Sequence, residues 1–150
     1  MFPGTNLDTS ARRDELLHHL RKSSENNRVQ VHFNMRTVDP SNSDNAVNPA
    51  WRPMYLFSQQ AVRWPPHAPP AEILRLRNEF QQGDMQRWRD ISPGAGSYLA
   101  EADRLEPDFG QAFCGEKYPR LLDLKFKLDL NSSLDCYTRL LRRSWHRETT

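Results

Sequence analysis

The sequence predicts an α+β fold in which helices flank a sheet. Residues 29–36 alternate apolar and polar side chains with a period of two, which is typical of a half-buried strand. Residues 8–22, 71–90 and 109–128 instead place apolar side chains three and four residues apart, which indicates amphipathic helices. The length of 150 residues fits one domain at most.

The first predicted helix, residues 8–22, begins with three candidate N-cap residues at positions 8–10. Its charge order, with acids early and bases late, suits the helix dipole. The predicted apolar stripe consists of Leu16, Leu17 and Leu20. We expect the polar run 23–27 to end the helix.

Two strands and a loop follow. On the first strand, residues 29–36, the residues that share the apolar face are Val29, Val31, Phe33 and Met35. Residues 37–50 are rich in Asn, Asp and Ser, which predicts an exposed loop between strands. Residues 54–64 alternate less regularly but favour a second strand paired with the first, because aromatic and β-branched residues suit sheets.

Residues 64–70 contain four prolines and are predicted to be a connector, because each proline lacks an amide donor. The helix over 71–90 follows, with a predicted buried stripe of Ile73, Leu76, Phe80 and Trp88. Its arginines are Arg75, Arg77, Arg87 and Arg89. Because acids are interleaved with them, we expect a solvated helix face rather than a nucleic-acid surface.

The last third of the chain begins with a turn of small residues at 92–96 and a short extended run at 97–100. A helical tract over 109–128 is predicted to break near Gly115 and Pro119. Its apolar stripe consists of Leu121, Leu124 and Leu128.

Composition weighs against several functions. The 21 Lys plus Arg and 19 Asp plus Glu leave a net charge of +2, which gives no overall field for nucleic acid or an anionic membrane. Residues 130–150 are predicted to be a basic C-terminal tail. No run of apolar residues is long enough to span a membrane, and the first residues lack a secretory signal. The sequence gives no other indication of a compartment, which stays unknown. A hydrophobic content of 37% suggests an under-filled core.

Few residues form a recognisable catalytic or metal-binding motif. Cys114 and Cys136 have no Cys or His at ligand spacing, which predicts two free thiols and no metal site. The histidines at 18–19 are expected in solvent. Glu101 and Asp103 lie at strand spacing, which would place two carboxylates on one face for acid–base chemistry. Turn-forming charges that end a strand explain this spacing better.

Residues 92–129 read SPGAGSYLAEADRLEPDFGQAFCGEKYPRLLDLKFKLD. The stretch contains a small-residue turn before a Tyr, an acidic Glu-Ala-Asp, a Glu-Pro turn, two helix starts and a Lys-x-Lys-x-Asp ending. Together with Asn-Pro-Ala-Trp-Arg at 48–52, it resembles the C-terminal region of berberine bridge enzyme-like FAD-linked oxidoreductases. Within that family, the sequence most resembles fungal enzymes of secondary metabolism, including those of alkaloid pathways.

The resemblance implies that residues 1–129 are part of a substrate domain, an antiparallel sheet backed by helices and laid over the ring of FAD. In that family a hydride passes from a small-molecule substrate to the flavin, which then reduces O2. The FAD-binding domain is absent from these residues. We therefore expect a truncated oxidoreductase that is inactive alone and needs a FAD-binding domain in cis or in trans.

Two candidate site residues follow from the resemblance. Tyr98 matches the tyrosine that acts as catalytic base beside the flavin in several members. This role needs a neighbouring positive charge or hydrogen-bond donor, because an ordinary phenol has a pKa of about 10. Ala100 would share a strand face with Tyr98 and stands where the family usually has an Asn that contacts flavin or substrate. Tyr98 and Ala100 are thus the predicted cofactor-binding positions, the Asn side chain being lost.

Three alternatives stay open. An equal interpretation of Tyr98 is a packed strand tyrosine whose hydroxyl has a hydrogen-bond partner within the fold. The whole chain could be a non-catalytic interaction module or the remnant of a decayed gene. An RNA-binding domain is disfavoured by the interleaved acids and by the lack of a basic, aromatic-studded sheet.

Overall fold

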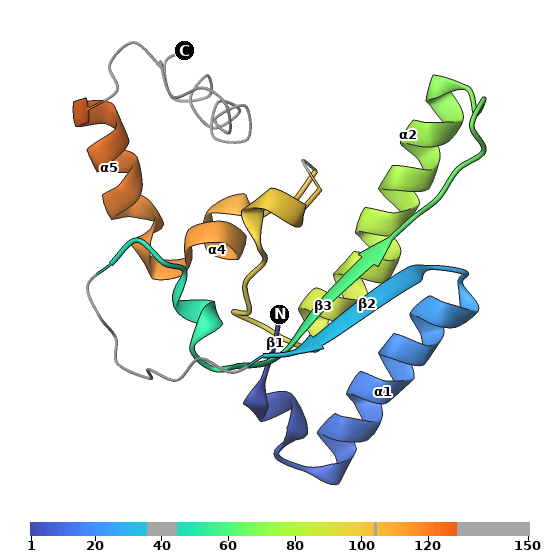
Figure 1. Cartoon of the computed structure of the whole chain (residues 1–150), viewed down its shortest axis with the longest axis horizontal. Coiled ribbons are helices and arrows are strands. Elements are labelled where there is room, and N and C mark those ends of the chain that lie inside the picture. The colour runs from blue at the N-terminus through green and yellow to red at the C-terminus, as the bar shows by residue number, and fades with distance from the viewer. Residues whose placement is uncertain (36–44, 104, 129–150) are drawn as a thin grey trace.

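The computed structural model describes residues 1–35, 45–103 and 105–128. They form a three-stranded antiparallel sheet with helices (Figure 1), so the predicted α+β class is confirmed. The strands are ordered β1 (Phe2–Pro3), β3 (Met54–Ala61) and β2 (Val29–Asn34). The predicted tail at 130–150 and Cys136 lie outside the described residues, as does most of the loop at 37–50.

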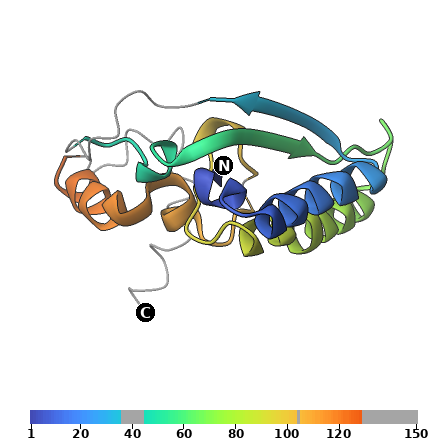
Figure 2. The ribbon, with the colours of Figure 1, turned by 90° about the horizontal axis from the view of Figure 1, so that it is seen from below.

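The pairing of β2 with β3 confirms the two predicted strands. Phe33 lies opposite Phe57, and Val31 lies opposite Gln59. Strand β3 ends at Ala61, three residues before its predicted end, and the proline-rich connector follows. Helices α1 and α2 lie on one side of the sheet, as Figure 2 shows, and no described α-helix covers the other side.

Helix α1 (Ser10–Glu25) begins as predicted, with the hydroxyl of Thr9 accepting a hydrogen bond from the amide of Arg12 at 3.3 Å. It continues beyond its predicted end because the small Ser23 is buried and lets the last turn pack closely. Leu16 is buried, but Leu17 faces solvent. The correction follows from helix geometry, since adjacent residues lie about 100° apart around the axis.

The hydrophobic core lies between the sheet and the helices. Phe2, Leu16 and Trp88 form its centre, and the rings of Phe2 and Trp88 meet edge to face with centroids 5.1 Å apart. Leu20 and Leu56 pack against this cluster. The core is therefore assembled from β1, α1, β3 and the second long helix.

That second helix has three parts: α2 (Pro70–Glu79), a π-helical segment (Phe80–Met85) and α3 (Gln86–Asp90). Phe80 and Trp88 are buried as predicted.

The prediction of a solvated arginine face was wrong for three of the four arginines. Arg75 lies in solvent between Glu72 and Glu79. The other three arginines are only partly exposed and form ion pairs within the protein: Arg77 with Asp103, Arg87 with Asp84 and Arg89 with Glu106. The sequence pattern missed this because the partners of Arg77 and Arg89 come from a distant segment.

Asp84 is the most deeply buried charge of this helix, with a side chain 2% exposed. Its carboxylate accepts hydrogen bonds from Arg28 Nε at 2.5 Å and from Asn26 Nδ2 at 2.9 Å, and it pairs with Arg87. The guanidinium of Arg28 also lies 5.6 Å from the centre of the Phe80 ring. These contacts tie the turn between α1 and β2 to the π-helical segment.

The predicted extended run at 97–100 is confirmed at Tyr98, whose backbone is extended, and was wrong from Leu99 on. Leu99–Glu101 instead forms a 3₁₀ turn, closed by a 3.1 Å hydrogen bond from the Glu101 amide to the Tyr98 carbonyl. No described strand lies beside this segment to pair with it, so the backbone satisfies its hydrogen bonds locally.

The C-terminal helical tract consists of α4 (Phe109–Cys114), a 3₁₀ turn (Gly115–Lys117) and α5 (Tyr118–Leu128). The predicted break at Gly115 is confirmed, and its φ of 58° is one that favours glycine. Pro119 lies in the first turn of α5, where a missing amide donor is tolerated, so it causes no break. The stripe of α5 is largely uncovered within the described residues, and Leu128 is exposed.

Candidate functional site

The side of the sheet away from the helices carries a row of four aromatic rings. Phe33 stacks on Phe57 with centroids 6.1 Å apart, and Trp51 stacks on the same Phe57 at 5.5 Å. Tyr98 meets Trp51 edge to face at 5.9 Å. We call Phe33, Phe57, Trp51 and Tyr98 the aromatic row. Beside it, Val31 is 44% exposed.

This exposure is notable because the same strand face was predicted to be half-buried. Phe33 is 44% exposed, because β2 lies at the edge of the sheet and no described α-helix covers this face. Val31, Phe33 and Tyr98 are exposed, whereas Phe57 is buried and Trp51 is half-buried. Exposed apolar side chains that gather on one side of a folded chain indicate a surface that binds something. The aromatic row is therefore the first candidate site.

Tyr98 is positioned by a junction of three segments. Asn48 caps the 3₁₀ turn Pro49–Trp51 by accepting the amide of Ala50 at 3.0 Å, and its Nδ2 donates to the carbonyl of Ala112 at 2.9 Å. The amide of Ser97 donates to the same carbonyl at 2.6 Å. The two stretches that carry the family resemblance, 48–52 and 92–129, thus meet at one point, next to Tyr98.

Gly96 completes the junction. A Cβ at this position would lie 2.7 Å from Asn48 Nδ2 and 2.7 Å from the Cβ of Ala50. Sequence analysis placed Gly96 only in a turn and did not single out Asn48. The signal was present in the Asn-Pro pair, which is a common start of a helical turn.

The structure separates the two predicted cofactor positions. Tyr98 is 43% exposed at the end of the aromatic row. Ala100 lies in the 3₁₀ turn, so the argument that it shares a strand face with Tyr98 was wrong. Their contacts with a cofactor remain predictions.

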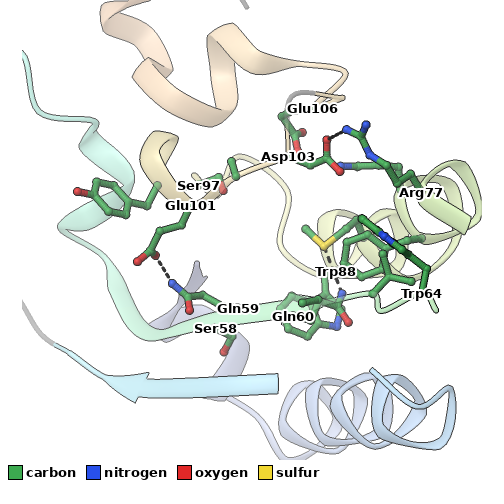
Figure 3. Close-up of a pocket in the computed structure, with 17 residues that line it drawn as sticks. Ser58, Gln59, Gln60, Trp64, Arg77, Trp88, Ser97, Glu101, Asp103 and Glu106 are labelled. Carbon is green, nitrogen blue, oxygen red and sulfur yellow. Dashed lines mark hydrogen bonds and ion pairs between the residues drawn. The ribbon is translucent and has the colours of Figure 1, made fainter. Parts of the chain in front are cut away.

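The predicted carboxylate pair serves two different contacts. Glu101 accepts a hydrogen bond from Gln59 on β3, and Asp103 pairs with Arg77 Nη2 at 2.5 Å (Figure 3). Because each carboxylate has its own partner, the pair does not form a shared acid–base site. Arg89 also donates two hydrogen bonds to Glu106, at 3.0 and 2.9 Å. These contacts hold Glu101 against β3, and Asp103 and Glu106 against the second long helix.

A cavity of about 270 Å³ lies between β3, the second long helix and residues 97–106 (Figure 3). A second cavity of about 500 Å³ shares Ser58, Met85 and Trp88 with it. Two residues that line the smaller cavity each have a buried polar atom without a hydrogen-bond partner, namely Trp88 Nε1 and Gln60 Oε1. The smaller cavity is the second candidate site.

The remaining motif residues add no catalytic group. Cys114 is a half-buried free thiol, and burial raises its pKa. His18 is exposed as predicted, whereas His19 is half-buried and its pKa is lowered, mainly by burial and then by His18. The residues that the structure describes contain no group of three His, Cys, Asp or Glu side chains able to hold a metal ion. No helix among them is both long and apolar enough to cross a membrane.

The described residues fit one part of FAD and not another. Phe33 and Tyr98 are the exposed rings of the aromatic row, at 44% and 43%, and give an apolar surface of the kind that packs on a flavin ring, whereas Phe57 is buried. A pyrophosphate instead needs several converging amide groups, typically at a glycine-rich turn before a helix. The one glycine-rich turn within residues 92–96 packs Gly96 against Asn48. The described chain therefore offers a surface for the ring and no cradle for the phosphates.

Comparison with curated proteins shows similarity to fungal flavoproteins. The chain is 31% identical over 114 residues to the VAO-type flavoprotein oxidase VAO615 of Thermothelomyces thermophilus, covering 75% of this chain and 20% of that protein. It is 30% identical over 84 residues to the FAD-linked oxidoreductase ZEB1 of Gibberella zeae, covering 56% and 15%. It is 39% identical over 87 residues to the flavin-dependent oxygenase ucdF of Aspergillus ustus, covering 57% and 15%.

The resemblance to a partial region of FAD-linked oxidoreductases is therefore confirmed. The chain spans a fifth or less of the length of these relatives. No family model matches the chain, and no solved structure matches it.

Proposed function

We propose that this chain is part of the substrate domain of a FAD-linked oxidoreductase, and that the aromatic row faces the flavin and the substrate. The observation that carries the proposal is the place of Tyr98. The tyrosine that matches the family motif ends a row of rings on the sheet face that no described α-helix covers. FAD, when bound, accepts a hydride from the substrate and passes the electrons to O2.

Within this proposal the aromatic row supplies an apolar wall that excludes water from one face of the reaction site. Tyr98, which is 43% exposed at the end of the row, takes a proton from the substrate as the phenolate and becomes the neutral phenol. This role requires a positive charge or a donor close to the phenol in the assembled protein. Ala100 supplies neither, because its side chain has no polar atom.

The chemistry of the wall also describes the substrate. An aromatic surface favours an apolar small molecule, and a tyrosine base suits a substrate with an ionisable hydroxyl or amine group. A fungal secondary metabolite, such as an alkaloid, has this chemistry. The phosphates of FAD would be held by a FAD-binding domain in cis or in trans, which fits the small share of the relatives that this chain spans.

A chimera tests the proposal. The 114 matching residues of the Thermothelomyces oxidase are replaced by their counterparts from this chain, and flavin reduction by that enzyme's own substrate is followed without oxygen. We expect the chimera to bind FAD, and Tyr98→Phe to slow flavin reduction by about 100-fold or more, as for loss of a general base.

The matched control is Tyr118→Phe, which removes a hydroxyl from α5, where the ring packs on Phe109 at 5.7 Å. This control should reduce flavin at the rate of the unsubstituted chimera. Equal rates for Tyr98→Phe and the unsubstituted chimera would exclude the base role.

A non-catalytic interaction module is the second candidate, because an exposed apolar row is also suited to contact another protein. The same chimera separates the two functions. A folded chimera that binds no FAD, whatever residue stands at 98, would favour the interaction module.

A further inference from the structure

Strand β3 has one edge that is only partly paired. On the side away from β2, strand β1 covers β3 near Met54 and Leu56. Residues 57–61 of β3 have no strand beside them on that side among the described residues. Figure 3 shows Glu101, Asp103 and Glu106 of the smaller cavity on this side of β3, whereas the Ser58 side chain points toward β2, where its hydroxyl is hydrogen-bonded to His32 Nδ1 at 2.8 Å.

The register of β1 predicts what fits this edge. Phe2 lies opposite Leu56, and the two strands are antiparallel. A strand that runs on from β1 in the direction of its N-terminus would therefore place Met1 opposite Phe57 and the residue ahead of it opposite Ser58. Four residues ahead of Met1 would cover the edge as far as Ala61.

The existing ladder indicates which groups of β3 face this edge. Phe2 pairs with Leu56, and a register shift lies between Phe2 and Pro3. Because Pro3 has no amide hydrogen to donate, Phe2 and Leu56 are the pair that exchanges the hydrogen bonds of the ladder. Backbone groups alternate in direction along a strand, so Ser58 and Gln60, like Leu56, direct their N–H and C=O groups to this edge.

The cavities follow the same path. The larger one, of about 500 Å³, is lined by Met1, Phe2, Phe57 and Ser58, and the smaller one by Ser58 to Ala61. Side chains of an added strand opposite Ser58 and Gln60 would share the face of Phe2, which contacts Trp88. The unpartnered Trp88 Nε1 and Gln60 Oε1 lie there, and Trp88 is 6% exposed. A buried donor and a buried acceptor without partners are costly, which indicates a missing polar partner.

We propose that the free edge of β3 is a strand-addition site, occupied by an extended polypeptide segment that is joined to residue 1 and continues β1. This occupant is the one that continues the existing β1–β3 ladder. A separate peptide at the same edge would have to end directly beside Met1. The segment pairs with Ser58 and Gln60 and places polar side chains toward Trp88 and Gln60. This inference is independent of the proposed function, because it depends only on the register and the cavities.

Two extended versions of the full chain test the site. One carries Val-Thr-Val-Thr directly ahead of residue 1, with both threonines on the face of Trp88. The matched control carries Val-Pro-Val-Pro, in which proline removes the two amide donors that would face β3. Amide hydrogen exchange is followed by NMR in both and in the unextended chain, with circular dichroism confirming that all three fold.

We expect the threonine extension to slow exchange of the Ser58 and Gln60 amides by about tenfold or more relative to the proline extension. The amides of Phe57 and Gln59, which the alternation directs to β2, should change by less than about twofold. The indole N–H resonance of Trp88 should shift with the threonine extension alone. Equal exchange of Ser58 and Gln60 in the two extended chains would overturn the proposal.

Discussion

Asn48 and Ala112, 64 residues apart in the chain, are joined by a hydrogen bond of 2.9 Å from the side-chain nitrogen Nδ2 of Asn48 to the backbone carbonyl of Ala112. The same Asn48 side chain caps the turn that carries Trp51, and the same carbonyl receives the amide of Ser97, next to Tyr98. One buried amide side chain thus fixes both ends of the contact between Trp51 and Tyr98.

Asn48→Ala should therefore destabilise the chain by about 2 kcal/mol, since it removes a cap and leaves a buried carbonyl with one donor fewer. Urea unfolding followed by tryptophan fluorescence measures the loss. Asn78→Ala, on the exposed face of α2, is the control and should change the free energy of unfolding by less than about 0.5 kcal/mol. Equal stability of the two variants would show that the junction contributes nothing.

Gly96→Ala should cost about 1–3 kcal/mol of stability, because the new Cβ would overlap Asn48 and Ala50 at 2.7 Å. Gly83→Ala is the matched control. Its Cβ would have Arg87 Nη1 as nearest atom at 3.7 Å, and alanine suits a helix better than glycine. Thermal unfolding should therefore show a lower midpoint for Gly96→Ala and an unchanged or higher one for Gly83→Ala; the reverse order would contradict the packing described for Gly96.

Asp84→Asn should destabilise the chain by about 3 kcal/mol, because it leaves Arg28 and Arg87 beside a neutral partner in a buried site. Asp123→Asn breaks the exposed pair of Asp123 with Lys127 and should cost less than about 0.5 kcal/mol. Chemical denaturation of both variants in parallel measures the difference. A loss as small for Asp84 as for Asp123 would mean that the buried ion pairs contribute little net stability.

Cys114 should react slowly with alkylating agents, because burial raises the pKa of its thiol and the thiolate is the nucleophile. In the Cys136→Ser chain, the rate of iodoacetamide labelling should reach half its maximum at a higher pH when folded than in urea. The raised pKa also affects stability, because the Cys114 thiol of the unfolded chain loses its proton at a lower pH than the same thiol of the folded chain. Stability is thus fully present below the ordinary pKa of a thiol and falls as pH rises through the range between the two values. A folded midpoint at or below the unfolded one would contradict the burial of this thiol.

The purified chain should be colourless, because the described residues offer a surface for a flavin ring and no cradle for its phosphates. Absorbance after mixing with excess FAD and gel filtration measures this directly. A stoichiometric yellow complex that survives filtration would refute the assignment of FAD binding to another domain. Trp51→Ala, which removes the centre of the aromatic row, would then show whether the row holds the ring.

Much of the local structure could be predicted because it depends on neighbours within a few residues. The helix after Thr9, the strand with Phe33 and the break at Gly115 each follow from spacing, capping or backbone freedom. The resemblance at Tyr98 likewise depends on a short run of sequence. The same reasoning failed for Leu99 and Ala100, which form a 3₁₀ turn because no described strand lies beside them. It also failed for Arg77 and Arg89, whose carboxylate partners are residues 103 and 106.

The sequence by itself determined, to within a few residues, where the main helices and the strands β2 and β3 begin and end, and which family its motifs resemble. It did not predict β1. The tertiary structure decided which apolar face is covered and which is left open. Periodicity states that Val31 and Phe33 share a face, but burial depends on what packs there, and here the helices pack on the opposite side. It also decided that Asn48 and Gly96 position Tyr98, and that the edge of β3 at Ser58 and Gln60 is open, because contacts between residues far apart in the chain exist only once the elements have assembled.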